Sequence, residues 1–159
     1  MQIEPRRARP DEWPQISEVF IAARSAMPYL PDLHTRGETR AFFKGVAQTQ
    51  EIWAVDAPLD AASRIAGFAA IHEDWLDHLY IHPAMQNLNI GSALLDIVKT
   101  QRPQGFSLWT FQQNTGAQRF YERHGLVLAR LSDGGDNEEG LPDALYVWRG
   151  AGLMEDASQ

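Results

Sequence analysis

Hydrophobic residues recur at helical spacing in two N-terminal segments of this chain. In the first segment, Asp11 is typical of a helix cap, and Pro14 falls in the first turn, where proline is tolerated. This helix should end before Pro28. In the second segment, Thr35 and Glu38 have the spacing of a capping box ahead of another helix. The stretch MPYLPDLHT between them contains two prolines and predicts an ordered loop.

A strand-like pattern dominates the rest of the chain and is interrupted by two further helices. A helix is expected from Ile90, because apolar residues recur there at positions i, i+3, i+4, i+7 and i+8. Asn114 is typical of the cap of a short helix that Gly125 would end. Strands are expected at residues 51–55, 64–72, 75–82, 106–111, 126–131 and 144–148, with a weakly patterned first strand at 2–9. The resulting order, β-α-α-β-β-β-α-β-α-β-β, predicts an α/β fold in which helices cover a mixed sheet.

Composition and charge exclude several kinds of site. The chain of 159 residues has the length of one domain, and we expect a single domain over residues 1–159. It contains no cysteine, which excludes disulfide bridges, zinc–thiolate sites and a cysteine nucleophile. Its 21 acidic and 14 basic side chains give a net charge of −7, which argues against nucleic-acid binding. No apolar run is long enough to cross a membrane, and none follows the basic N-terminus, so we expect a cytoplasmic protein.

The segment QNLNIGS, directly before and within the start of the Ile90 helix, is a candidate phosphate site. The N-terminus of a helix presents backbone N–H groups and a partial positive charge, which bind phosphate without a charged side chain. Close approach of the backbone favours residues that accept a positive φ. Gly91 is one, and Asn87 and Asn89 are the best suited residues other than glycine. Ser92 adds a hydroxyl group in the first turn. The same segment could instead be an ordinary turn that binds nothing.

Two longer segments sharpen this hypothesis. DHLYIHPAMQNLNIGSALLD and LWTFQQNTGAQRFYERHGL strongly resemble the GCN5-related N-acetyltransferase (GNAT) family. In that family a strand ending at proline leads into a Q/R-x-x-G-x-G/A loop and a helix, and an N-x-x-A-x-x-F-Y-E-x-x-G-F helix follows later. The later pattern matches here, with Leu126 in its last place, at Asn114, Ala117, Phe120, Tyr121, Glu122 and Gly125. The resemblance implies the GNAT fold, acetyl-CoA as cofactor, and transfer of the acetyl group to a primary amine by direct attack.

The resemblance also implies which residues would hold acetyl-CoA. The pantetheine arm would be bound by backbone groups of the strand residues Leu79, Tyr80 and Ile81. Asn114 would hydrogen-bond the pantetheine, unless it serves only as a helix cap. Ala117 and Tyr121, of the same motif, would also contact the cofactor. The phosphate loop would comprise Gln86, Asn87, Leu88, Asn89, Ile90, Gly91 and Ser92.

Attack of an amine on a thioester requires both an acid and a base. Tyr121 falls where the family has its general acid, and its phenol could protonate the departing thiolate, although it could equally be a core aromatic residue. Asp77 is the first candidate for the base and Glu73 the second. Each carboxylate could instead be a solvated charge at a turn, and a water relay could replace a single base.

Two loops are expected to border the acceptor channel, as they do in the family. The first contributes Tyr29, Leu30 and His34, and the second, an acidic run that could also be merely solvated, contributes Asp133. These loops would suit a small amine or a cationic side chain.

Three histidines in the central strands suggest a metal site at first sight. His72 belongs to one expected strand, and His78 and His82 belong to the next. His78 and His82 are four residues apart, which places them about 13 Å from each other along the strand. One metal ion could not reach both, so no metal is expected.

Two departures from the family loop weaken the expected binding of acetyl-CoA. Asn89 stands where glycine is usual, and Leu88 where arginine is frequent. A different class of function therefore stays open, namely a member that binds CoA or a partner without catalysis and acts as a sensor or scaffold. A homodimer through the last strands is also plausible from the sequence.

Overall fold

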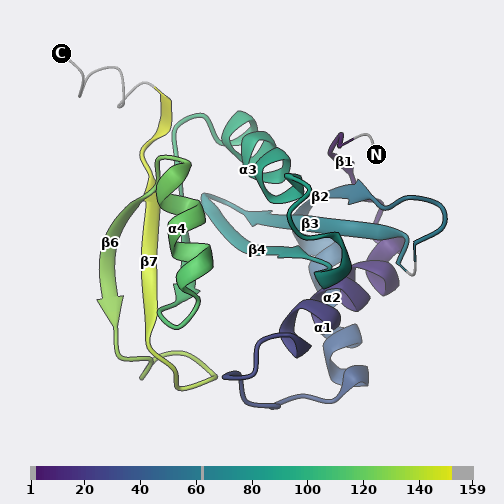
Figure 1. The fold of residues 1–159 in the computed structure, drawn as a ribbon, viewed down its shortest axis with the longest axis horizontal. Helices are drawn as coiled ribbons and strands as arrows, with labels where there is room; N and C mark the ends of the chain where they lie inside the picture. Colours follow the sequence, from purple (N-terminus) through teal and green to yellow (C-terminus); the bar gives the residue numbers. More distant parts are fainter. Residues whose placement is uncertain (1–2, 62, 152–159) are drawn as a thin grey trace. The chain divides into compact units, whose positions relative to one another are not determined.

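The helices and strands of the computed structural model follow the order expected from the sequence (Figure 1). The structure describes residues 3–61 and 63–151. The helices are α1 (Trp13–Ser25), α2 (Arg36–Thr49), α3 (Ile90–Gln101) and α4 (Thr115–Arg123), with 3-10 turns η1 (Pro10–Glu12) and η2 (Pro83–Met85). The strands are β1 (Arg6–Arg7), β2 (Glu51–Asp56), β3 (Ile65–His72), β4 (Trp75–Ile81), β5 (Phe106–Phe111), β6 (Val127–Ser132) and β7 (Asp143–Trp148). The first strand is much shorter than the expected 2–9, of which residue 2 lies outside the described residues.

The strands are hydrogen-bonded in the order β1-β2-β3-β4-β5-β7-β6. β4 pairs with β5 in parallel, whereas the β1–β2, β2–β3, β5–β7 and β6–β7 pairs are antiparallel, so the sheet is mixed as predicted. The chain forms two compact units. The first comprises the residues up to His72 together with Asp77–Val98, and the second comprises Glu73–Leu76 and the residues from Lys99 onward.

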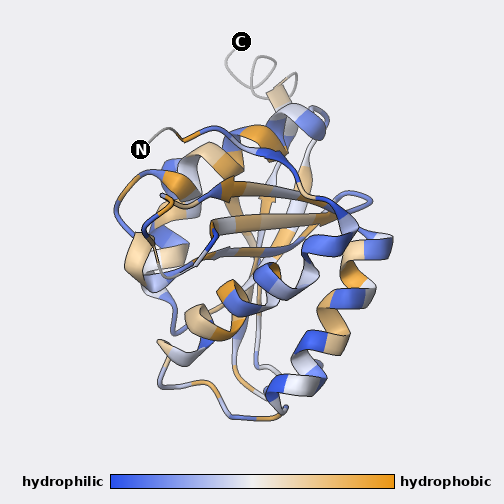
Figure 2. Ribbon diagram, turned by 90° about the vertical axis from the view of Figure 1, so that its right-hand side faces the viewer, coloured by the Kyte–Doolittle hydropathy of each residue, from blue (hydrophilic) through white to orange (hydrophobic). Residues whose placement is uncertain are grey.

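The first unit has its core where α1 and α2 pack on β2 and β3. Every residue of β3 except His72 is buried, and Figure 2 shows the central strands largely in hydrophobic colours while the helices alternate between hydrophobic and hydrophilic residues. The amphipathic spacing of α1 and α2 explains this packing, because residues three and four apart lie on one helix face. The core members are Ile16, Val19, Phe43, Val46, Ile52, Ala54, Ile65, Phe68 and Ala70.

The expected capping box of the second helix is confirmed. The Thr35 side chain accepts a hydrogen bond from the Glu38 backbone N–H at 3.1 Å, and the Glu38 carboxylate accepts one from the Thr35 backbone N–H at 2.8 Å. The local sequence therefore fixes where α2 begins.

The expected role of Asp11 as the cap of α1 is wrong. Asp11 lies inside the 3-10 turn η1, and the N-cap of α1 is Glu12. The Glu12 carboxylate accepts hydrogen bonds from the Arg9 backbone N–H and from the Arg6 guanidinium, all at 2.7–2.8 Å. These bonds explain the difference, because they fold residues 9–12 into a tighter turn before the α-helix starts.

The second unit contains the antiparallel strands β5, β7 and β6 together with α4. One face of β7 is buried at Ala144, Tyr146 and Trp148, and Leu108 of β5 lies beside Tyr146 in register. The first five residues of β6 are all exposed, which is consistent with its place at the end of the strand order. Gly125 ends α4 with a φ of 85°, as the sequence predicted.

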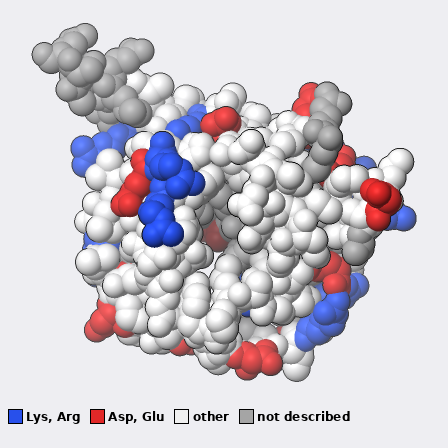
Figure 3. All heavy atoms as spheres, viewed as in Figure 1, with Lys and Arg blue, Asp and Glu red and all other residues white. Residues whose placement is uncertain are grey.

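The described residues include no helix that is long and apolar enough to cross a membrane. On the face drawn in Figure 3, basic and acidic side chains form small separate clusters and no continuous basic patch.

Candidate active site

Strand β4 is held on one side by a cluster of aromatic rings. His78 lies within ring-stacking distance of Phe20, Phe42 and Phe43, with ring centroids 6.1, 5.8 and 5.2 Å away, and Tyr80 packs on Phe20 at 4.9 Å. Alternate strand residues share a face, so His78 and Tyr80 anchor β4 to α1 and α2. The side chains of Leu79 and Ile81, on the opposite face, are half-buried.

Burial in this cluster makes the first unit sensitive to acid. Burial lowers the pKa of His78 to about 4, with a smaller contribution from the positive charge of Arg24, whereas an unfolded histidine has a pKa near 6.5. Between pH 6.5 and pH 4, His78 is therefore protonated in the unfolded chain but not in the folded chain. The free energy of unfolding falls as the pH drops through this range. Between pH 7 and pH 5, we expect His78 to remove about 2 kcal/mol from the free energy of unfolding.

A phenylalanine substitution tests this expectation by urea denaturation at the two pH values. His78→Phe keeps a ring in the cluster and should lose most of the pH dependence, whereas substitution of the exposed His34 by glutamine should keep it. Equal pH dependence in the wild type and His78→Phe would show that His78 is not the responsible group.

The loop before α3 has the backbone conformation that its two asparagines suggested. Asn87 and Asn89 adopt φ values of 65° and 63°, both in the left-handed region. Residues 86–89 are exposed, and α3 begins directly after them at Ile90, which is buried. The Asn89 carbonyl accepts the first intrahelical bond, from the Ala93 N–H at 3.1 Å. The N–H groups of the first helical turn have no partner further back in the helix and carry its partial positive charge.

Gly67 in β3 lets the end of β4 and the start of α3 come close together. A Cβ atom at this position would lie 2.7 Å from Ile81 Cδ1, 3.0 Å from the Tyr80 carbonyl oxygen and 3.2 Å from Ile90 Cγ2. Any larger residue would push apart the two elements that frame the loop. The sequence reasoning missed this residue, although an isolated glycine in a strand pattern is a known sign of close backbone approach.

Of the two candidate bases, Asp77 has the more structured environment. Its carboxylate accepts a hydrogen bond from Gln50 Nε2 at 3.0 Å. Partial desolvation raises the pKa of Asp77, while His72 and the Gln50 hydrogen bond oppose that rise. Glu73 is an exposed residue of the β3–β4 turn, with a φ of 55°, and its carbonyl accepts a hydrogen bond from Arg102.

In the second unit, α4 carries the later motif. The Asn114 side chain accepts a hydrogen bond from the Ala117 N–H at 3.1 Å, so its expected role as a helix cap is confirmed. Tyr121 is only 7% exposed, and its ring lies 5.3 Å from that of Phe120 and 6.2 Å from that of Tyr146. Tyr121 is therefore packed between aromatic neighbours.

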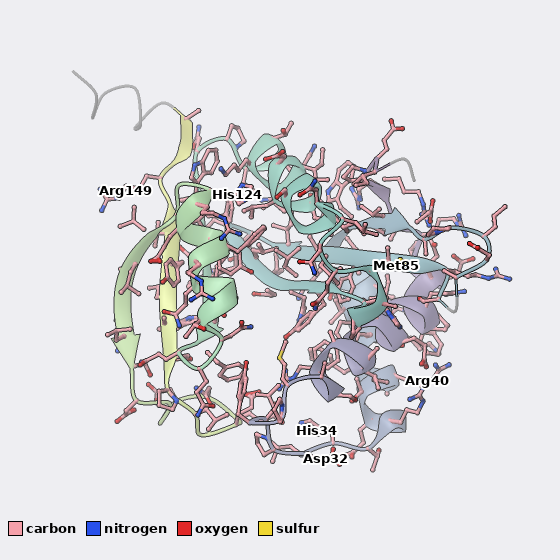
Figure 4. The ribbon with its side chains drawn as sticks, in the orientation of Figure 1. Asp32, His34, Arg40, Met85, His124 and Arg149 are labelled. Atoms are coloured by element: carbon pink, nitrogen blue, oxygen red, sulfur yellow. The ribbon has the colours of Figure 1, made fainter. Side chains whose placement is uncertain are left out.

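The residues expected at the acceptor channel lie in both units. Tyr29 and Leu30 are half-buried, and Tyr29 is close enough to Tyr80 for their phenols to influence each other. His34 is exposed on the loop between α1 and α2, near Asp32 (Figure 4). Asp133, in the second unit, accepts a hydrogen bond from the Gly135 N–H at 2.9 Å and so shapes its own turn.

The acidic loop of the second unit is closed by its own hydrogen bonds. Asn137 Nδ2 donates to the Leu141 carbonyl at 2.7 Å and to the Asp143 carboxylate at 3.1 Å. A Cβ atom on Gly134 would lie 2.2 Å from the Leu141 carbonyl oxygen, so only glycine fits there. These bonds and the glycine give the loop a defined conformation, with Asp133, Asp136 and Glu138 exposed on it.

His78 and His82 have separate surroundings. His78 lies in the aromatic cluster, and His82 Nδ1 accepts a hydrogen bond from the Ala84 N–H at 3.1 Å. Within residues 3–61 and 63–151, no group of three or more potential metal ligands is arranged to hold an ion.

A family model described as an acetyltransferase (GNAT) domain matches residues 48–126, which include β4, the asparagine loop and α4. The chain belongs to the GNAT acetyltransferase family. The fold class and the enzyme class expected from the sequence are thereby confirmed, and both motifs that carried the resemblance lie within the matched range or at its end.

Solved structures of other GNAT-fold proteins superpose over nearly the whole chain. The apo form of YjaB from Escherichia coli gives a TM-score of 0.74 at 20% sequence identity, covering 95% of this chain and 100% of YjaB. NAA60 from Arabidopsis thaliana, solved with a bisubstrate analogue, gives 0.70 at 18% identity, covering 91% and 95%. RimL, the ribosomal L7/L12 alpha-N-protein acetyltransferase, was solved with coenzyme A and gives 0.68 at 13% identity, covering 92% and 93%. No curated protein matches the sequence.

Proposed function

We propose that this GNAT protein transfers the acetyl group of acetyl-CoA to the nitrogen of a primary amine by direct attack. The observation that carries the proposal is the pair of left-handed asparagines, Asn87 and Asn89, directly before α3 in a chain of this family. The N-terminus of α3, directly after this loop, presents backbone N–H groups and a partial positive charge that favour an anion.

In the proposal, the backbone of the loop before α3 binds the diphosphate of acetyl-CoA. The chain carries a net charge of −7, which repels an anion at a distance, so its binding must come from local N–H groups. In the proposal, residues 86–92 hold the diphosphate, and the backbone of Leu79–Ile81 holds the pantetheine arm. Asn114 and Ala117, at the start of α4, provide further cofactor contacts.

Proton transfer is assigned to Tyr121 and Asp77. As the amine nitrogen bonds to the acetyl carbon, the carbon–sulfur bond breaks and a thiolate leaves. Tyr121 donates its phenolic proton to that thiolate, and Asp77, directly or through water, accepts the proton that the amine loses. The hydrogen bond from Gln50 Nε2, which fixes the position of the Asp77 carboxylate, supports its choice over Glu73.

The acceptor is proposed to be an amine on a small molecule or a peptide. RimL, named as an acetyltransferase of the ribosomal protein L7/L12, supports the inclusion of peptide acceptors. Tyr29, Leu30, His34 and Asp133 are the residues proposed to select the acceptor.

The proposal is tested by release of free CoA thiol from acetyl-CoA over a panel of amines. The panel should contain free amino acids, polyamines, aminoglycosides, lysine peptides and peptides with free N-termini, and mass spectrometry should show a product heavier by one acetyl group. Amine-dependent thiol release supports the proposal. Binding of acetyl-CoA without turnover of any amine would favour a sensor or scaffold instead.

Replacing both loop asparagines with glycine should tighten the binding of acetyl-CoA. The backbone already has positive φ at Asn87 and Asn89, which glycine adopts without strain, and the side-chain bulk beside the phosphates is removed. We expect a severalfold lower dissociation constant for Asn87→Gly/Asn89→Gly by calorimetry. The matched Asn87→Ala/Asn89→Ala variant should bind more weakly than the wild type, because alanine is strained at these φ values. Unchanged affinity in the glycine variant would refute the idea that the asparagines weaken binding.

A further inference from the structure

The second unit contains a buried phenol that the proposed chemistry does not use. Tyr146 of β7 is 1% exposed, and its ring lies 6.2 Å from the Tyr121 ring at an angle of 39°. In register along the sheet, Tyr146 lies between Leu108 of β5 and Leu128 of β6. Its ring is therefore part of the surface against which Tyr121 packs.

The Tyr146 hydroxyl is bonded to the helix that carries Tyr121. It lies 3.3 Å from Gln118 Oε1 and 3.4 Å from Glu122 Oε2. Its single proton can be donated to one of these acceptors at a time. Gln118 precedes Tyr121 by three residues and Glu122 follows it, so both bonds act on the helical turn that carries Tyr121.

Further hydrogen bonds connect Gln118 of α4 to neighbouring loops and strands. Gln118 Nε2 donates to the Gln112 carbonyl at 2.7 Å. Gln112 Nε2 in turn donates to the carbonyls of Ser132 and Asp143, each at 3.0 Å. These part-buried side-chain amides thus tie α4 to the ends of β6 and β7 and restrain the helix.

We infer that Tyr146 is a positioning residue that fixes the orientation of the Tyr121 side chain for catalysis. Its ring supports the Tyr121 ring, and its hydroxyl restrains α4 through Gln118 and Glu122. Burial and the neighbouring Glu122 carboxylate raise the pKa of Tyr146, so the hydroxyl keeps its proton at the pH of an assay. This inference rests on the proposed role of Tyr121 as the proton donor.

Tyr146→Phe tests the inference because it removes the hydroxyl and keeps the ring. We expect kcat to fall about tenfold while KM for acetyl-CoA changes less than twofold. In a Tyr121→Phe background the same substitution should leave kcat unchanged, because there is no longer a phenol to orient. The control is Ser17→Ala, which removes a buried hydroxyl of the first unit, bonded to the Trp13 carbonyl at 2.6 Å, and should not change kcat.

A spectroscopic measurement separates positioning from a general loss of structure. Protein labelled with ¹³C at the tyrosine ring carbons gives signals from four tyrosines, and Tyr121→Phe assigns one of them. The Tyr121 signal should move in Tyr146→Phe and stay in place in Ser17→Ala.

The inference and the proposed function fail in distinguishable ways. Wild-type kcat in Tyr146→Phe, or an equal loss in both backgrounds, would overturn the role of Tyr146 while leaving acetyl transfer intact. Absence of turnover in the wild type would overturn the proposed function. In that case an unmoved Tyr121 signal in Tyr146→Phe would also overturn the inference.

Discussion

Tyr121→Phe is expected to lower kcat by about 100-fold, which is the low end of the range for a lost general acid. The substitution removes only the hydroxyl oxygen, so the thiolate would have to leave without a proton from the protein. The aromatic packing with Phe120 and Tyr146 survives, because phenylalanine keeps the ring. The measurement is steady-state thiol release at saturating acetyl-CoA and amine.

Two further measurements test whether the loss of kcat in Tyr121→Phe comes from the chemical step rather than from weaker binding or lower stability. Calorimetry should give a dissociation constant for acetyl-CoA within about twofold of the wild type, since the proposed contacts are made mainly by backbone groups. The unfolding temperature should stay close to that of the wild type. A variant that retains full kcat would show that Tyr121 is a core aromatic residue, which was the alternative interpretation of the sequence.

The elements of the fold could be predicted because their signals are local. The Thr35–Glu38 capping box, the Asn114 cap and the glycine end of α4 each involve residues within a few positions of one another. The left-handed conformation of Asn87 and Asn89 follows in the same way, from the side chain's own tolerance of positive φ.

The contacts that define the surroundings of the site come from distant parts of the chain. Tyr146 is 28 residues from Gln118, and Gln50 is 27 residues from Asp77. Periodicity and motif spacing contain no information about such pairs, because they depend on the register between strands. The wrong prediction of Asp11 as the helix cap has the same cause. Glu12 takes the cap position because Arg6 binds its carboxylate, and Arg6 in turn pairs with Asp56, 50 residues away in the sequence.

Glu12→Gln is expected to cost roughly 3 kcal/mol in the free energy of unfolding at pH 7. The Glu12 carboxylate is almost fully buried. It accepts hydrogen bonds from both terminal nitrogens of Arg6, at 2.7 and 2.8 Å. The hydrogen bonds from Arg6 lower the pKa of Glu12 to about 2, against an ordinary 4.5, despite the opposing effect of burial. A folded pKa below the unfolded value means that the stabilisation is present above pH 4.5 and is lost as the pH falls towards 2.

Glu18→Gln is the matched control for this loss. Glu18 also pairs with arginines, Arg36 and Arg40, but its side chain is 39% exposed, and exposed ion pairs contribute less than about 1 kcal/mol. At roughly 2–4 °C per kcal/mol for a chain of this length, Glu12→Gln should lower the unfolding temperature by about 6–12 °C and Glu18→Gln by less than about 4 °C. As the pH falls to 2 and below, the wild type and Glu12→Gln should converge in stability, because protonation of Glu12 in the folded state then removes the same charge. Equal effects of the two substitutions at pH 7 would mean that the bidentate Arg6–Glu12 pair does not hold the N-terminal strand and turn together.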